Sequence, residues 1–127
     1  MNRKGTVCIV DDDDAVRDSM RVLVESYGYP VRDYPSAMAF LSDLRDDEPG
    51  CLLLDLHMPG MDGLELVELL RRRRVLTPAI IVTGRKDPVH LQRVTDAGVL
   101  ALLNKPVDDD ELIGWIEQAL GARTPAH

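Results

Sequence analysis

Five side chains that can do chemistry stand at or just beyond the ends of short apolar runs. In chain order they are Asp11, Asp12, Asp55, Thr83 and Lys105. Three carboxylates held close together in a partly dry site repel one another, so a positive group must compensate them. Mg²⁺ prefers oxygen ligands, keeps several waters and bridges carboxylates to phosphate. We therefore expect Mg²⁺ here, and not Zn²⁺, because no Cys or His cluster accompanies these residues.

The same residue types are suited to phosphoryl transfer. A carboxylate can attack phosphorus and form an acyl phosphate. Lys105 offers a point charge that can hold a phosphate, and Thr83 can donate a hydrogen bond to a phosphoryl oxygen. The set therefore predicts transfer of a phosphoryl group onto an aspartate beside a bound cation.

The elements that must position these residues alternate along the chain. Four apolar runs are nearly continuous, as in strands covered on both faces: Val7–Val10, Cys51–Leu54, Ala79–Val82 and Val99–Leu103. A weaker run, Val31–Tyr34, follows Pro30 and is predicted to be an edge strand.

Amphipathic helical patterns lie between and after these runs. The first has an apolar face from Val16 to Tyr27, and Ser36 is expected to cap the second. The third is predicted from Gly63 to Arg74. The fourth is predicted from Asp87 to just before Gly98, and the fifth from Asp108.

Strand and helix thus alternate five times, which predicts an α/β fold with a parallel sheet and helices on both faces. In such sheets the ligand lies outside the carboxyl ends of the strands, where the five reactive residues fall. No linker divides the chain. Residues 1–127 are therefore expected to form one domain, with a core at about 6–121 and a frayed tail or linker start at 122–127.

Four segments carry a resemblance to a known family. They are Ile9-Val-Asp-Asp12, Leu54-Asp-Leu-His-Met-Pro-Gly-Met-Asp-Gly63, Val82-Thr-Gly84 and Asn104-Lys-Pro106. With these segments in this order, the chain resembles the receiver domain of bacterial two-component response regulators from about Val7 to Leu120. The resemblance implies a flavodoxin-like (βα)5 sheet with strand order 2-1-3-4-5.

The resemblance also implies a role for each matching residue. Asp55 falls on the phosphoacceptor, Asp12 on a direct Mg²⁺ ligand and Asp11 on a neighbour that acts partly through water. The backbone carbonyl of His57 falls on a further metal ligand. Thr83 and Lys105 fall on the pair that contacts the phosphoryl group, and the Lys105–Pro106 bond on a cis peptide.

One position departs from the family pattern. Receivers commonly carry Tyr or Phe three residues before the lysine, and this chain has Leu102. The threonine half of the family's switch remains at Thr83. Trp115 is expected either to border the switching surface or to pack in the core.

The resemblance implies that a sensor histidine kinase or phosphotransfer protein docks near the first helix and phosphorylates Asp55. Phosphorylation would then bias a pre-existing conformational equilibrium of the face formed by the fourth helix, fifth strand and fifth helix. This face could pair with a second copy of the chain. We expect a phosphorylation switch that controls a transcriptional output, not an enzyme. The alternatives are a stand-alone receiver in a phosphorelay and, less favoured, a Mg²⁺-dependent phosphohydrolase, for which His57 stands where a second carboxylate is needed.

Composition narrows the range of functions. The chain has 15 basic and 22 acidic residues, a formal net charge of −7, which disfavours direct binding to nucleic acid. Arg71–Arg74 is accordingly interpreted as a solvated helix end. Cys8 and Cys51 are expected to be buried in a reducing compartment. Because no apolar run approaches the roughly 18 residues of a membrane span, we expect no membrane contact and a cytoplasmic location.

Overall fold

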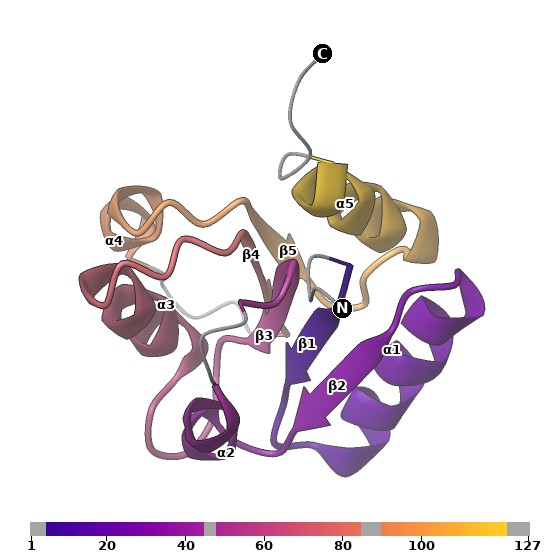
Figure 1. Cartoon of the computed structure of the whole chain (residues 1–127), viewed down its shortest axis with the longest axis horizontal. Helices are drawn as coiled ribbons and strands as arrows, with labels where there is room; N and C mark the ends of the chain where they lie inside the picture. The colour runs from indigo at the N-terminus through magenta and orange to yellow at the C-terminus, as the bar shows by residue number, and fades with distance from the viewer. Residues whose placement is uncertain (1–4, 45–47, 85–89, 122–127) are drawn as a thin grey trace.

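Branched and aliphatic residues fill the short apolar runs, and these runs pair into one parallel sheet. A computed structural model describes residues 5–44, 48–84 and 90–121 (Figure 1). The strands are β1 (Val7–Val10), β2 (Val31–Tyr34), β3 (Cys51–Asp55), β4 (Ala79–Thr83) and β5 (Ala101–Asn104). All four neighbouring pairs are parallel, in the order β2-β1-β3-β4-β5, which confirms the predicted fold.

Within the described residues, five helices connect and follow the strands. They are α1 (Asp14–Ser26), α2 (Ala37–Asp43), α3 (Gly63–Arg72), α4 (Leu91–Asp96) and α5 (Asp109–Gly121). Ser36 caps α2, because its hydroxyl accepts a hydrogen bond of 3.0 Å from the Ala39 amide. The predicted start of the fourth helix at Asp87 lies outside the described residues.

The helices form two layers over the sheet (Figure 1). Side chains of α2, α3 and α4 share one buried cluster with Leu52 and Leu54 of β3. Side chains of α1 and α5 share another with Cys51 and Leu53 of the same strand. Successive residues of a strand point to opposite faces, so a continuous apolar run is what a doubly covered strand requires.

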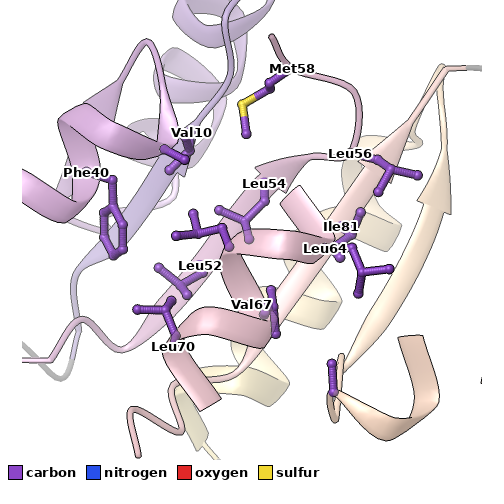
Figure 2. Packing of buried hydrophobic residues seen from close by; sticks show 14 of the residues in the cluster. Val10, Phe40, Leu52, Leu54, Leu56, Met58, Leu64, Val67, Leu70 and Ile81 are labelled. Atoms are coloured by element: carbon purple, nitrogen blue, oxygen red, sulfur yellow. The ribbon is translucent and has the colours of Figure 1, made fainter. Parts of the chain in front are cut away.

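Figure 2 shows the cluster beneath α2 and α3. Phe40 of α2 and the α3 side chains Leu64, Val67 and Leu70 gather on the β3 side chains Leu52 and Leu54. Phe40 is 2% exposed and Leu70 is fully buried. This packing fixes α3 against β3, and so fixes the loop between them, which carries residues of the site described below.

Several predicted boundaries were wrong by one or two residues, for local reasons. Asp55 and Thr83 are still paired as the last residues of β3 and β4, opposite Val82 and Asn104. β5 begins at Ala101 rather than Val99, because the Val99 amide still bonds to the Val94 carbonyl at the end of α4.

Two helix ends also differ from the sequence prediction. α3 ends at Arg72 instead of Arg74, whose φ of 65° turns the chain away from the helix. Tyr27 was expected on the buried face of the first helix. It is instead the C-terminal cap residue of α1 and is 49% exposed.

Both cysteines are buried, and neither forms a disulfide. Cys8 and Cys51 belong to different clusters on opposite faces of the sheet. Burial raises the pKa of the Cys51 thiol to about 12, which keeps it protonated and unreactive. Within the described ranges, none of the helices has the length and apolarity needed to cross a membrane.

The expectation that Arg71–Arg74 is a solvated helix end was wrong for its first residue. Arg71 is only partly exposed, whereas Arg72 is exposed. The Arg71 guanidinium donates to the carbonyls of Val75 at 2.9 Å, Thr77 at 3.0 Å and Ala97 at 2.9 Å. It therefore ties the end of α3 to the segment before β4 and to the end of α4.

We predict that Arg71→Ala lowers the free energy of unfolding by about 2 kcal/mol, because it leaves partly buried carbonyls without their charged donor. Arg72→Ala is the matched control and should change it by less than about 0.5 kcal/mol, as is usual for surface positions. Urea unfolding measures both. Equal effects of the two substitutions would contradict the structural role given to Arg71.

Candidate functional site

The carboxyl ends of the strands bring the reactive residues to one edge of the sheet. Asp11 directly follows β1, Asp55 and Thr83 end β3 and β4, and Lys105 directly follows β5. Carboxylate oxygens of Asp11, Asp12 and Asp55 all lie within 4.8 Å of one another. The Lys105 Nζ atom lies 3.5 Å from Asp55 Oδ1 and 3.9 Å from Asp11 Oδ2.

Burial governs the electrostatics of two of these carboxylates. Asp11 is fully buried and Asp55 is 7% exposed, whereas Asp12 is exposed. Burial raises the pKa of Asp11 above its ordinary value of 3.8, against the hydrogen bond that its carboxylate accepts from the Asp13 amide. Burial also raises the pKa of Asp55, opposed chiefly by Lys105. The cluster is thus a place where negative charge is costly.

The donor set fits a hard divalent cation. Three carboxylates face one lysine, so a fully ionised cluster keeps an excess of negative charge. The Oδ2 atom of Asp11 is buried and has no hydrogen-bond partner among the described residues. A buried oxygen of this kind, beside two further carboxylates, offers the all-oxygen surroundings that Mg²⁺ prefers.

The residues after Asp12 begin α1 and do not join the cluster. Asp13 is the N-terminal cap, and its carboxylate accepts from the Val16 amide at 3.0 Å. Asp14 is the first residue of the helix. The Asp13 carboxylate is therefore used to cap the helix, and the carboxylate cluster consists of Asp11, Asp12 and Asp55.

The loop after β3 wraps closely around Asp55. The His57 backbone amide donates to the Asp55 carboxylate and so lowers its pKa. Asp62 and Glu65 form a reciprocal cap at the start of α3. The Gly63 amide bonds to the Leu56 carbonyl at 3.0 Å, which brings the helix start against the end of β3.

His57 itself is partly exposed, and its imidazole Nε2 atom is buried with no hydrogen-bond partner among the described residues. It lines an open hollow of about 430 Å³ together with Asp12, Met58 and Asp62. The ligand role assigned to the His57 carbonyl stays a prediction.

Thr83 and Lys105 are held together through their main chains. The Lys105 amide donates to the Thr83 carbonyl at 2.8 Å. Thr83 is 1% exposed and the Lys105 side chain is 30% exposed. The peptide bond between Lys105 and Pro106 is cis. A phosphoryl group on Asp55 would therefore have an ammonium group beside it and a hydroxyl on the neighbouring strand.

Leu102 and Trp115 pack against opposite faces of the sheet. Leu102 of β5 borders the cluster shared with α4, and Trp115 of α5 borders the cluster shared with α1. Both are partly exposed. Partial core packing therefore accounts for Trp115.

Gly63 is a site residue for which the sequence analysis gave a place in a family segment and at a helix start, but no role at the site. A Cβ atom at this position would lie 2.5 Å from the Asp55 carbonyl oxygen and 3.3 Å from the Leu56 Cα atom. Both contacts are with backbone, which cannot move aside as a flexible side chain can. Only glycine allows α3 to start this close to Asp55.

The family model of the response regulator receiver domain matches residues 7–117, and the chain belongs to this family. The transcriptional regulatory protein FixJ of Bradyrhizobium diazoefficiens is 36% identical over 99% of the chain, which covers 62% of FixJ. The response regulator TodT of Pseudomonas putida is 35% identical over 94% of the chain and 52% of TodT. The chain thus spans about half to three fifths of these curated relatives.

Solved structures agree with this assignment. The crystal structure of FixJ-N superposes with a TM-score of 0.85 at 35% identity, covering 95% of this chain and 97% of FixJ-N. The response regulator StyR superposes with a TM-score of 0.88 at 38% identity, covering 94% of this chain and 60% of StyR. The chain is a receiver domain of the two-component response regulators.

We predict that Gly63→Ala lowers the free energy of unfolding by about 1–3 kcal/mol, as overpacking against rigid neighbours does. Gly114→Ala is the matched control. A Cβ at Gly114 meets nothing within 4 Å, so this helical substitution should stabilise the protein by about 0.5–1 kcal/mol. Thermal unfolding distinguishes the two, and a neutral Gly63→Ala would contradict the close approach.

A second prediction concerns the metal-free protein. Because the pKa values of Asp11 and Asp55 are raised on folding, the folded state binds protons more tightly than the unfolded state. Stability should therefore fall as pH rises from the ordinary carboxyl pKa through the raised values. Asp55→Asn should weaken this fall and be more stable than wild type at neutral pH in EDTA.

Denaturant unfolding over a pH series, with EDTA throughout, checks this prediction. Asp18→Asn, at an exposed position outside the cluster, serves as the control for removal of one negative charge. If Asp55→Asn were less stable than wild type at neutral pH, repulsion within the buried carboxylate cluster would not be what destabilises the metal-free protein.

Proposed function

We propose that this domain is a phosphorylation switch in which Asp55 accepts a phosphoryl group from a histidine kinase or phosphotransfer protein. The observation that carries the proposal is the juxtaposition of Asp55, two further carboxylates and the Lys105 ammonium at one sheet edge. The family assignment gives the class of reaction. The roles of the individual residues are those that the resemblance to the family implies, and their positions support them.

Asp12, Asp55 and the His57 carbonyl would hold the Mg²⁺ ion, with Asp11 acting partly through water. When bound, Mg²⁺ would neutralise charge on the transferring phosphoryl group. An Asp55 carboxylate oxygen attacks phosphorus in line, the phosphorus–nitrogen bond of phosphohistidine breaks, and the imidazole leaves with the bonding electron pair. Lys105 would contact the new phosphoryl oxygens, and the 3.5 Å between its ammonium group and Asp55 Oδ1 supports this role.

Thr83 would couple phosphorylation of Asp55 to the α4-β5-α5 face. It is buried at the end of β4, one strand away from Asp55 and directly before the segment that leads to α4. A hydrogen bond from its hydroxyl to the phosphoryl group can form only after phosphorylation. It would therefore shift the conformational equilibrium of the α4-β5-α5 face toward the state in which this bond is made. Leu102 has neither an aromatic ring nor a hydroxyl, so it cannot supply the aromatic half of the family's switch. Its contribution to the switch would come from side-chain packing alone.

A groove beside α1 supports docking of the phosphodonor there. Its volume is about 610 Å³, and apolar side chains of α1 and α5 line it, including Met20, Leu23 and Leu112. Lys105 and Pro106 also line this groove. A helical partner seated in this groove would therefore bring its phosphohistidine next to Lys105 and Asp55.

The wider context is also proposed. Residues 1–127 would act as one receiver domain in the cytoplasm, without direct contact to nucleic acid or membrane, and would regulate a transcriptional output. The named relatives FixJ and TodT, a transcriptional regulatory protein and a response regulator, support this output. The phosphorylated α4-β5-α5 face could also pair with a second copy. The domain assists its own phosphorylation but turns over no free substrate, so it is not an enzyme.

We predict that acetyl phosphate with Mg²⁺ adds one phosphoryl group to the wild-type protein, and that EDTA or Asp55→Asn prevents the addition. Intact-mass spectrometry measures the product, and peptide mapping locates it. Asp108→Asn, a cap residue at the start of α5, is the matched control and should be labelled like wild type. Labelling of Asp55→Asn, or a label mapped to another residue, would overturn the proposal.

A further inference from the structure

Arg17 is the fourth residue of α1, and its side chain is 16% exposed. Its guanidinium bonds to three segments at once. Nη1 donates to the backbone carbonyl of Asp11 at 2.8 Å, Nη2 to the Asp14 carboxylate at 2.7 Å, and Nε to the Asp33 carboxylate of β2 at 3.3 Å. None of the site roles above makes use of this residue.

The contact with the Asp11 carbonyl completes a set of restraints on Asp11. Its amide donates to the Tyr34 carbonyl of β2 at 3.1 Å. One carboxylate oxygen accepts from the Asp13 amide at 2.9 Å. The amide, the carbonyl and one carboxylate oxygen of Asp11 thus all form hydrogen bonds. The second carboxylate oxygen, Oδ2, lies 3.9 Å from the Lys105 ammonium. Arg17 supplies the restraint on the carbonyl side.

Arg17 is itself held in place from β2. The two oxygens of the Asp33 carboxylate accept from different arginines, Oδ2 from Arg17 and Oδ1 from Arg21 at 2.9 Å. A guanidinium is a planar fork with donors in fixed directions, so it can bridge a carbonyl and two carboxylates simultaneously. The ammonium group of lysine is a single point charge and cannot span the same three acceptors.

We propose that Arg17 is a positioning residue for the divalent-cation site. It fixes the main chain of Asp11, and so keeps the Asp11 and Asp12 carboxylates within reach of Asp55. The inference rests on the proposed function, since it presupposes that these carboxylates hold Mg²⁺. Removal of a group that orients a metal ligand without touching the metal typically lowers metal affinity by about 10- to 100-fold.

Charge alone predicts the opposite effect. Removing a positive charge near a cation site should strengthen Mg²⁺ binding, because one source of repulsion is lost. A purely structural ion pair with Asp14 predicts a change in stability with no change in Mg²⁺ affinity. The three interpretations therefore differ in the sign or the presence of an effect on Mg²⁺ binding.

The test is calorimetric titration of MgCl₂ into the whole chain, at a temperature where circular dichroism shows each variant to be folded. Arg17→Met should weaken Mg²⁺ binding about tenfold, and Arg17→Lys, which keeps the charge, should also weaken it severalfold. Arg21→Met is the matched control. It removes a second cation from Asp33 without touching the Asp11 main chain, so the Mg²⁺ affinity should stay within about twofold of wild type.

Unchanged or tighter Mg²⁺ binding by Arg17→Met would overturn the inference, as would equal weakening by Arg21→Met. If Arg17→Met does not fold, Arg17→Lys against Arg21→Met decides the question, and equal affinities of these two would overturn it. Failure of wild type to bind Mg²⁺ would overturn the proposed function as well. Normal Mg²⁺ binding by both wild type and Arg17→Met would overturn only the role of Arg17.

Discussion

Three carboxylates within 4.8 Å of one another, two of them buried, are the constraint on which the rest of this receiver domain depends. A parallel sheet creates the problem, because it brings the carboxyl ends of β1, β3, β4 and β5 to one edge. Burial makes the charge costly, and Lys105 compensates only part of it. The same excess of negative charge is what would make the site bind a cation and then a phosphoryl group.

The surrounding structure is arranged to hold this unfavourable cluster in place. Gly63 lets α3 start against the backbone of Asp55, and the packed cluster of Figure 2 keeps α3 there. The Lys105 amide donates to the Thr83 carbonyl, which holds the residue that carries the ammonium group beside the residue that carries the hydroxyl. Stability from the core thus supports a site that is itself destabilising, a common feature of functional sites.

The sequence predicted the parts of the fold that local chemistry controls. Continuous apolar runs identified the strands, and Ser36 identified a helix start, because periodicity and capping depend on neighbours in the chain. The site residues could be selected for the same reason, since each follows an apolar run.

Contacts between distant segments could not be predicted in this way. Arg71 looked like a solvated charge, yet it bonds to the Ala97 carbonyl at the end of α4. Arg17 was not singled out by any sequence pattern, yet it donates to the Asp11 carbonyl. Side chains that bond to backbone carbonyls leave no pattern in the sequence, because every residue offers the same acceptor.

We propose that α4 couples the site to a response. Arg71 binds the end of α4, and the Arg93 guanidinium of α4 pairs with Glu68 of α3. Among the described residues, these two polar contacts add to the buried cluster that Val94 of α4 shares with α3. Polar contacts can exchange between arrangements more readily than a packed core can. With Leu102 in place of an aromatic residue, a change at Thr83 would reach the surface chiefly through α4.

A crystal structure of the protein with Mg²⁺ and beryllium fluoride, a mimic of the phosphoryl group, tests the central claim most directly. The account predicts one cation held by Asp12 and Asp55, and the fluoride group on Asp55 in contact with Thr83 and Lys105. A cation bound away from the carboxylate cluster, or a fluoride group on any other residue, would contradict it.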